Sequence, residues 1–245
     1  MVSKRRRERA VKNKENTLLL TPIAVARTDF SEKFGIPRQS GRVPLRARIV
    51  FLPKYRNPDA LRGIEGYSHL WLLWHFSELE EQKEFRPTVR PPRLGGNERV
   101  GVFASRSPYR PNPIGLSSVR LLGVEKTENE GCVLIVEGAD LLDGTPIFDI
   151  KPYLPTADLH FDAKGGFADE VKDYRLAVRC DDALLSRIPE EKREGLLALL
   201  ADDPRPAYQN DGERVYGLAF ASYEIKFTVF DGVLTVKDIT ERDKL

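Results

Sequence analysis

One ten-residue segment combines a stiff backbone with side chains that bind anions. Residues 106–115, Arg-Ser-Pro-Tyr-Arg-Pro-Asn-Pro-Ile-Gly, contain three prolines, two arginines and an asparagine. Because proline fixes its own φ angle and restricts the residue before it, such a loop loses little entropy when it orders around a ligand. The planar guanidinium suits carboxylates and phosphates, so the segment predicts a preorganised anion-binding loop. The alternative is a stiff surface turn between two strands.

A second segment, residues 140–153, interleaves three carboxylates, a lysine and a tyrosine with apolar residues typical of strands. Carboxylates accept hydrogen bonds from hydroxyls and amines, so this segment is suited to hold a polar ligand. The alternative is an Asp-Gly turn followed by a strand, with Asp149 and Lys151 as an exposed ion pair. Two shorter segments of similar composition are residues 35–39 and 203–208.

Several common site signatures are absent from the sequence. It contains no GxxxxGKS/T phosphate loop and no strand-turn-helix GxGxxG, which argues against nucleotide hydrolysis and a Rossmann-type site. His69, His75 and His160 lack the spacing of a helical metal pair, and the two cysteines lie far apart without neighbouring ligands. We therefore expect no metal. The residues alone indicate an anion-binding β domain.

Charge is distributed unevenly along the chain. Residues 37–120 carry 15 Lys and Arg against 7 Asp and Glu, whereas residues 121–245 carry 15 against 26. The arginines of the first range alternate with strand-like apolar residues, which favours an anionic partner. The basic run at residues 4–9 lacks hydrophobic periodicity and is interpreted as part of a flexible, solvated tail.

The elements that must position these segments are mostly strands. Short β-branched or aromatic runs between Gly, Pro and Asn turns are typical of a closed or sandwich-like β domain. The runs are residues 18–27, 43–52, 68–76, 100–104, 116–124 and 132–138. Farther along, the apolar face of residues 184–200 predicts a helix, and Asp231-Gly232 predicts a type I′ hairpin between strands at 214–230 and 233–239.

Length and composition set the broad class. A chain of 245 residues with 41% hydrophobic and 31% charged residues is expected to form one larger and one smaller globular domain. No apolar run approaches the length of a membrane span, and no signal peptide is recognised. Two isolated cysteines fit a reducing compartment, so we expect a cytoplasmic protein.

Eight short motifs follow one another along the chain. They are Pro37-Arg-Gln39, Gly66-Tyr-Ser-His-Leu-Trp71, residues 86–96, Gly101-Val-Phe-Ala-Ser-Arg-Ser-Pro108, Arg110-Pro-Asn-Pro-Ile-Gly115, Asp140-Leu-Leu-Asp-Gly-Thr-Pro146, Asp149-Ile-Lys-Pro-Tyr153 and Asp203-Pro-Arg-Pro-Ala-Tyr208. In series they resemble the TrmO (TsaA-like, YaeB) family over about residues 20–245. The resemblance implies a mainly β fold, with a small single-sheeted β-barrel domain that binds S-adenosyl-L-methionine (18–160), a smaller α+β C-terminal domain (161–245) and a basic tail (1–17).

The family's cofactor pocket maps onto matching positions of this chain. These positions are Pro37, Arg38, Gln39, Phe76, Ser77, Arg106, Leu116, Asp143, Gly144, Thr145 and Pro146. We expect Arg106 to pair with the methionine carboxylate of the cofactor, and Asp143 to accept from its ammonium or ribose. The backbone of residues 143–146 is expected to hold the adenine edge.

The resemblance also implies an activity. Family members methylate N6 of threonylcarbamoyladenosine, next to the anticodon of tRNA on its 3′ side, and work as homodimers. Asp149, Asp143 and Tyr208 are possible acceptors of the proton that the nitrogen loses, and Asp149 is our choice. Expected contacts of the tRNA anticodon loop are Lys151, Tyr153, Arg205 and Tyr208, by phosphate pairing or base stacking. The alternative is a non-catalytic RNA-binding β-barrel protein.

Overall fold

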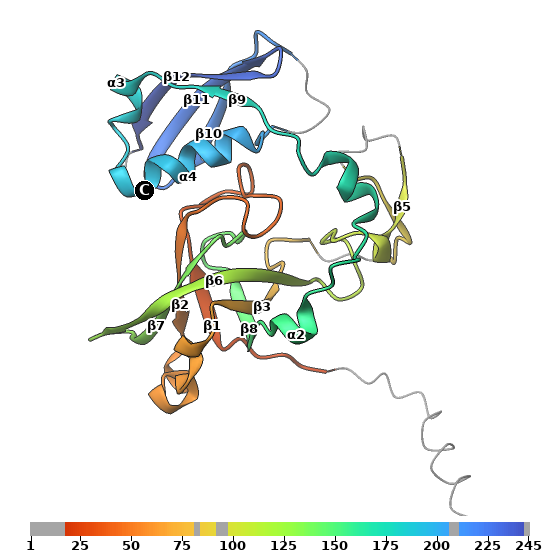
Figure 1. Ribbon diagram of the computed structural model, residues 1–245, viewed down its shortest axis with the longest axis vertical. Coiled ribbons are helices and arrows are strands. Elements are labelled where there is room, and N and C mark those ends of the chain that lie inside the picture. Colours follow the sequence, from red (N-terminus) through yellow and green to blue (C-terminus); the bar gives the residue numbers. More distant parts are fainter. Residues whose placement is uncertain (1–17, 81–83, 92–97, 206–210, 243–245) are drawn as a thin grey trace, which may run out of the picture.

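The computed structural model describes residues 18–80, 84–91, 98–205 and 211–242. It has a large sheet in the N-terminal half, a smaller sheet with helices in the C-terminal half, and a two-stranded hairpin (Figure 1). This content confirms the prediction of a mainly β protein. The predicted tail, residues 1–17, lies outside the described residues.

Six antiparallel strands of the N-terminal half close into a barrel in the order β1-β2-β7-β6-β3-β8. They are β1 (Ala24–Arg27), β2 (Arg46–Phe51), β3 (His69–His75), β6 (Ile114–Thr127), β7 (Gly131–Glu137) and β8 (Pro146–Pro152). Because side chains alternate between the two faces of a strand, β3 turns Leu70, Leu72 and Trp74 inward. Together with Ile49 and Leu134, they pack the interior of the barrel.

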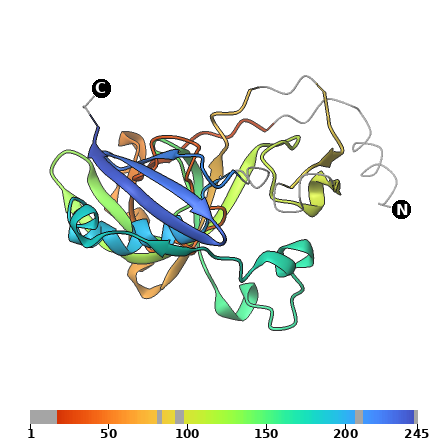
Figure 2. The ribbon, with the colours of Figure 1, turned by 90° about the horizontal axis from the view of Figure 1, so that it is seen from above.

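Two long connections flank β3. Between β2 and β3 lie three 3-10 turns, η2 (Pro53–Tyr55), η3 (Pro58–Leu61) and η4 (Ile64–Gly66). Between β3 and β6 the chain runs out to one side of the barrel through the hairpin of β4 (Thr88–Val89) and β5 (Val100–Gly101) (Figure 2). The strand predicted at 100–104 ends at Gly101, because the backbone turns into the 3-10 helix η6 (Val102–Ala104).

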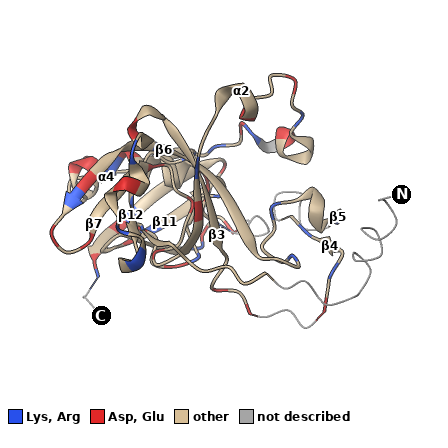
Figure 3. Ribbon diagram, turned by 90° about the horizontal axis from the view of Figure 1, so that it is seen from below, with Lys and Arg blue, Asp and Glu red and all other residues tan. Residues whose placement is uncertain are grey.

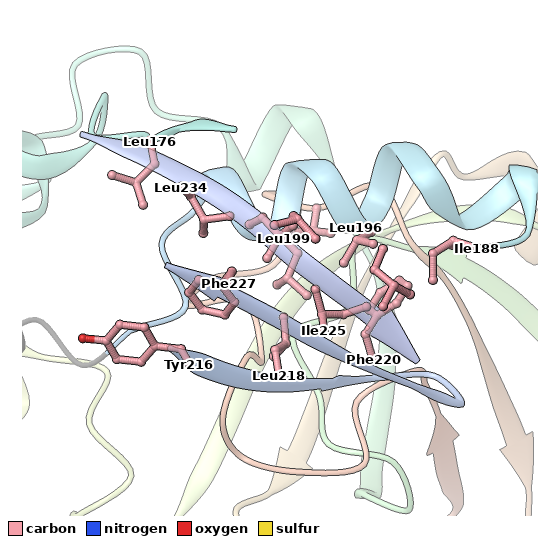
Figure 4. Close-up of a cluster of buried hydrophobic side chains, with 14 of the residues drawn as sticks. Leu176, Ile188, Leu196, Leu199, Tyr216, Leu218, Phe220, Ile225, Phe227 and Leu234 are labelled. Atoms are coloured by element: carbon pink, nitrogen blue, oxygen red, sulfur yellow. The ribbon is translucent and has the colours of Figure 1, made fainter. Parts of the chain in front are cut away.

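The C-terminal half is a four-stranded sheet in the order β10-β11-β12-β9. Its elements are β9 (Ala177–Arg179), α3 (Asp182–Leu185), α4 (Glu190–Ala201), β10 (Tyr216–Phe220), β11 (Tyr223–Phe230) and β12 (Val233–Glu241). Figure 4 shows Leu196 and Leu199 of α4 lying over Phe227 and Ile225 of the sheet. The short helices α2 (Pro155–Asp158) and η7 (Gly166–Val171) connect this half to β8.

Two C-terminal elements that the sequence predicts as continuous are each divided. The helix predicted at 184–200 is α3 and α4, since Pro189 has no N–H to donate and caps the start of α4. The strand predicted at 214–230 is β10 and β11, separated by a tight turn in which Ala221 has a φ of 50°. The predicted hairpin at Asp231-Gly232 is confirmed, and both residues have the positive φ that a type I′ turn requires.

The segment that leads into β2 belongs to the C-terminal core. Phe30, Val43 and Leu45 are buried in the same cluster as the side chains of α4 and β10–β12. Packing is so close that a Cβ atom on Gly195 of α4 would lie 2.2 Å from Leu45 Cδ2. The loop between β1 and β2 is therefore held by both halves, and it carries residues 36–39 between its two buried ends.

Candidate active site

Four segments far apart in the sequence meet at one end of the barrel and enclose a cavity of about 510 Å³. They are residues 36–39, 74–79, 106–116 and 140–145. The end of β3 and the starts of β6 and β8 come together here because both strands pair antiparallel with β3. Three of these segments are the ones whose composition suggested binding, so the fold brings them to a single site.

Most of the predicted cofactor residues line this cavity. They are Pro37, Arg38, Gln39, Phe76, Ser77, Arg106, Leu116 and Thr145. Asp143, Gly144 and Pro146 are not among its lining residues. The Asp143 carboxylate instead accepts a hydrogen bond from Thr28 N–H at 3.0 Å and pairs with Arg27 at 3.4 Å. The turn at 143–146 is therefore fastened to the end of β1.

Arg106 is presented by a loop that fixes its own conformation. The hydroxyl of Ser105 accepts from the N–H of Ser107, and Arg110 donates to the carbonyl oxygens of Val102 and Ser105 at 3.4 and 3.3 Å. The exposed Arg106 guanidinium donates to Gln39 Oε1 at 2.6 Å. Because Gln39 is neutral, this contact orients the guanidinium and leaves its charge available to an anion.

A polar chain runs from the barrel interior to the cavity. The indole N–H of Trp74 donates to Ser117 Oγ at 2.9 Å, and the Ser117 hydroxyl donates to Asp140 Oδ1 at 2.6 Å. Burial raises the pKa of Asp140, although Ser117 and the cationic Arg106 act in the opposite direction. Asp140 lines the cavity and is absent from the predicted site. Its place in the same motif as Asp143 was the signal that could have identified it.

Gly115 makes room for this chain. It lies opposite Trp74 in the register of β3 and β6, and a Cβ atom there would lie 2.2 Å from Trp74 Cε2. Only a residue without a side chain lets the indole lie flat against β6 with its N–H on Ser117. The glycine that ends the proline-rich motif therefore shapes the wall of the cavity.

A second hollow of about 480 Å³ adjoins the first. The two share His75, Phe76, Leu79, Pro108 and Arg110. The outer walls add prolines from the 106–115 loop, the carboxylates Glu80 and Glu84, and Phe85, whose ring stacks on Phe103 with centroids 6.2 Å apart. This continuity gives a ligand in the first cavity an opening toward a surface of aromatic and proline side chains with two carboxylates at its edge.

The residues of β8 and its end that were predicted to accept the proton or to contact tRNA lie outside the cavity. Asp149 and Lys151 form an ion pair at 2.8 Å, and Asp149 holds the pKa of the Lys151 ammonium above its usual value. Neither lines the cavities described above. Tyr153 packs against Trp71 with ring centroids 5.6 Å apart. These side chains form a polar and aromatic outer surface on β3 and β8.

Arg205 has an environment that does not suit the tRNA contact predicted for it. Only 8% of this residue is exposed. Its Nε donates to Asp203 Oδ1 at 2.9 Å and its second terminal nitrogen to Asp203 Oδ2 at 3.2 Å. A guanidinium held in this way does not present its donors to a phosphate. Tyr208, also predicted to contact tRNA, lies outside the described residues.

The Asp203–Arg205 pair is connected to the cavity through Arg38. The Arg38 guanidinium donates to the carbonyl oxygen of Asp203 at 2.5 Å and to that of Arg205 at 3.5 Å. Arg42, in the same loop, pairs with Asp202 at 2.5 Å. The C-terminal half therefore holds the loop that supplies Pro37, Arg38 and Gln39 to the cavity wall.

Two further features bear on the kind of protein. Within residues 18–80, 84–91, 98–205 and 211–242, no three His, Cys, Asp or Glu side chains are grouped to hold a metal ion. In the same part of the chain, no helix has both the length and the apolar character that crossing a membrane requires.

Fold and site define a protein that binds a small ligand at the end of a six-stranded barrel, in a pocket built from loops. Comparison with known proteins identifies the family to which the chain belongs. Residues 25–159 match the model of the tRNA-methyltransferase O N-terminal domain, and residues 174–242 match that of the TrmO C-terminal domain. The chain belongs to the TrmO family, which confirms the resemblance found in the sequence.

Individual relatives are similar over most of their length. A protein of Escherichia coli K12 named tRNA (adenine(37)-N6)-methyltransferase is 41% identical over 218 residues, covering 85% of this chain and 92% of the relative. A Pseudomonas aeruginosa protein described as a putative S-adenosylmethionine-dependent methyltransferase is 44% identical over 207 residues, covering 81% and 87%. A crystal structure of TrmO from Pseudomonas aeruginosa superposes with a TM-score of 0.74 at 34% identity, covering 92% of this chain and 97% of that one.

Proposed function

We propose that this chain transfers a methyl group from S-adenosyl-L-methionine to N6 of threonylcarbamoyladenosine, next to the anticodon of tRNA on its 3′ side. The observation that carries the proposal is the cavity at the barrel end, built from the segments that resemble the family's cofactor site. The names of the relatives from Escherichia coli and Pseudomonas aeruginosa support the same activity and cofactor. They favour it over a non-catalytic RNA-binding protein.

The cavity residues fit this cofactor. A volume of about 510 Å³ lies within the usual range for small-molecule pockets. Phe76, Ile114 and Leu116 offer apolar walls for an adenosine group, and Arg106 offers a planar cation for the methionine carboxylate. The bound cofactor supplies an electrophilic methyl group on a sulfonium centre. The residues of this chain supply position, because the 106–115 loop is ordered by prolines and by its own hydrogen bonds.

The second hollow is where we place the acceptor base. Methyl transfer requires the acceptor nitrogen to approach the donor directly, so the base must enter from a space continuous with the cofactor cavity. That space is bounded by Phe85 and by prolines of the 106–115 loop, which offer flat apolar surfaces to a base turned out of the anticodon loop. Arg110 lines both hollows and therefore lies beside both partners.

Contacts to the rest of the tRNA remain predictions. Lys151, Tyr153 and Tyr208 are proposed to bind the anticodon loop. Asp149, chosen from the sequence as the proton acceptor, lines neither hollow and pairs with Lys151 at 2.8 Å, so we do not propose a direct proton transfer from a base in the second hollow to Asp149. Arg86, Arg90 and Arg99, on the connection that carries β4 and β5, are exposed and add positive charge to this part of the protein, whereas Glu80 and Glu84 line the second hollow itself. Figure 3 shows Lys and Arg positions around β4 and β5. Pairing with phosphates through such residues makes binding weaken as salt concentration rises.

The proposal is tested with purified protein, labelled cofactor and tRNA that carries threonylcarbamoyladenosine. We expect labelled N6-methylated threonylcarbamoyladenosine among the digested nucleosides, detected by mass spectrometry, and none on tRNA that lacks the modification. Failure of the wild-type chain to bind S-adenosyl-L-methionine at millimolar concentration would leave the non-catalytic RNA-binding alternative. Binding of the cofactor without methylation of this tRNA would show that the acceptor is a different molecule.

We also propose a domain division, an oligomeric state and a cellular compartment. The barrel and the C-terminal sheet are proposed as two domains, with the boundary near residue 160 and the tail at 1–17. Their separate sheets support the division, and the two apolar clusters do so except for Phe30, Val43 and Leu45, which precede the boundary but pack in the C-terminal cluster. We also propose that the protein is a homodimer and acts in the cytoplasm, where tRNA is modified. Light scattering on the purified chain measures its mass, and a monomer at working concentration would refute the dimer.

A further inference from the structure

Asp140 is an ionisable group of the cavity to which the sequence-based assignment gives no role. It lies in the connection between β7 and β8, and a neutral donor holds its carboxylate in place. The Ser117 hydroxyl donates to Oδ1 at 2.6 Å, and the backbone near Ser40 and Asp140 also helps to lower the pKa of this carboxyl against the effect of burial. Ser117 is fully buried and is in turn fixed by the indole of Trp74. The carboxylate therefore has one orientation.

This carboxylate lacks a close cationic partner. In the part of the chain that the structure describes, no Lys or Arg nitrogen lies within 4.0 Å of it, although Arg106 is near enough for its charge to act on it. Burying a carboxylate without a counter-charge is unfavourable, and here burial raises its pKa. A cationic group of a ligand in the cavity would remove this penalty.

Arg106 and Asp140 line the same cavity and offer one positive and one negative group. The α-carbon of an amino acid carries a carboxylate and an ammonium, so the pair is complementary to the amino-acid end of a ligand. We propose that Asp140 accepts hydrogen bonds from the α-ammonium of the cofactor's methionine group, while Arg106 pairs with its α-carboxylate. This inference rests on the proposed function, since it assumes that the cavity binds S-adenosylmethionine.

The proposal replaces an expectation from the sequence. Asp143 was expected to accept from this ammonium, but its carboxylate is occupied by Thr28 N–H and Arg27 at the end of β1. Asp140 lies three residues earlier and faces the cavity that Arg106 also faces. The same DxxD motif thus supplies one carboxylate to the structure and one to the ligand.

The test compares two ligands that differ only at the amino-acid end. S-adenosylhomocysteine has this end, whereas 5′-methylthioadenosine keeps the adenosine and the thioether without it. Dissociation constants are measured by calorimetry for the wild type, for Asp140→Asn and for Glu130→Gln. Glu130 is the control, because it pairs with Arg48 at the turn between β6 and β7, at the other end of β6 from the cavity.

We expect Asp140→Asn to weaken S-adenosylhomocysteine about 10- to 100-fold and 5′-methylthioadenosine by less than about twofold, as the loss of a charged hydrogen bond predicts. Glu130→Gln should change neither constant. Equal weakening of both ligands would overturn the proposal and show that Asp140 only shapes the cavity. No weakening of either ligand would also overturn it.

A measurement on the wild type keeps the test valid if Asp140→Asn does not fold. A deaminated analogue of S-adenosylhomocysteine, with hydroxyl in place of the α-ammonium, should bind the wild type about 10- to 100-fold more weakly than the parent. Equal binding of the two would refute the contact. Failure of the proposed function has a different signature, because the wild type would then bind neither S-adenosylhomocysteine nor 5′-methylthioadenosine.

Discussion

Arg106 and Arg205 lie in proline-containing segments of similar appearance, and the fold gives them opposite environments. Arg106 is exposed at the cavity and bonds to a neutral amide, Gln39 Oε1. Arg205 is buried, and its backbone N–H, its Nε and a terminal nitrogen all donate to the carboxylate of Asp203. The first arginine keeps its charge available to a ligand, whereas the second neutralises its charge within the protein.

The difference follows from where each arginine finds its partner. Asp203 is two residues before Arg205, and its φ of 54° turns the chain so that the two side chains meet. Gln39 is far from Arg106 in the sequence and reaches it only because β1, β2 and β6 close into one barrel. A local acid makes a structural pair, while a distant neutral partner orients a cation that stays free to bind.

The strongest test of this comparison is Arg205→Ala. It leaves the Asp203 carboxylate buried without its guanidinium, so the free energy of unfolding should fall by about 3–5 kcal/mol, as when a buried ion pair loses one partner. Urea denaturation measures the change. Arg214→Ala is the matched control, since Arg214 lies over the same Tyr216 ring but is exposed, and it should cost about 1 kcal/mol or less. A stable Arg205→Ala variant that binds tRNA more weakly would restore the sequence-based assignment.

Arg106→Ala should give the opposite result. Because Arg106 is exposed, its loss should change the free energy of unfolding by less than about 0.5 kcal/mol. Loss of a charged pair with the cofactor should weaken S-adenosylhomocysteine by about 1.5–3 kcal/mol, measured by calorimetry. Arg99→Ala, on the hairpin and bonded to Thr88, is the control and should leave cofactor affinity intact. Normal affinity in Arg106→Ala would refute the role of Arg106 in cofactor binding and remove the contrast with Arg205.

Gly115→Ala tests whether the cavity depends on backbone space as well as on charge. The new methyl group would meet the Trp74 ring and displace the indole from Ser117, so we expect a loss of stability of about 1–3 kcal/mol. Affinity for S-adenosylhomocysteine should fall as well. Gly101→Ala is the control, because nothing lies within 4 Å of a Cβ atom there. Equal stability of the two variants would show that Trp74 adapts without cost.

The sequence predicts five of the six barrel strands, because alternation as in His69–His75 reports which face is buried. The sixth, β8, is not among the predicted runs, and the run at 100–104 lies outside the barrel. The composition of the sequence also identifies three of the four segments of the cavity, since stiff loops with arginine and carboxylate are unusual. The sequence does not distinguish Asp140 from Asp143, or Arg106 from Arg205, because the burial of each side chain depends on residues far away in the chain, even where its partner is as near as Asp203 is to Arg205. The sequence also misses where two C-terminal elements are divided. Local turns at Pro189 and Ala221 interrupt apolar patterns that continue across them.

The smallest expected effect concerns Asp140 in the absence of ligand. Burial raises the pKa of this carboxyl, so the folded state binds more protons than the unfolded state at pH values between the ordinary pKa of Asp and the raised one. The contribution of Asp140 to the free energy of unfolding therefore falls as pH rises through this range and stays low above it. Asp140→Asn keeps an oxygen for Ser117 but removes the charge.

We therefore expect ligand-free Asp140→Asn to be more stable than the wild type at pH 8 by at most about 1 kcal/mol, and this advantage to shrink as pH is lowered toward 4. Urea denaturation of both proteins across this range measures it, with Glu130→Gln as the control. A carboxylate retained at a cost to stability, and needed for ligand affinity, is the pattern expected of a binding group. A variant less stable than the wild type at every pH would instead make Asp140 a structural partner of Ser117, in the same class as Asp203 beside Arg205.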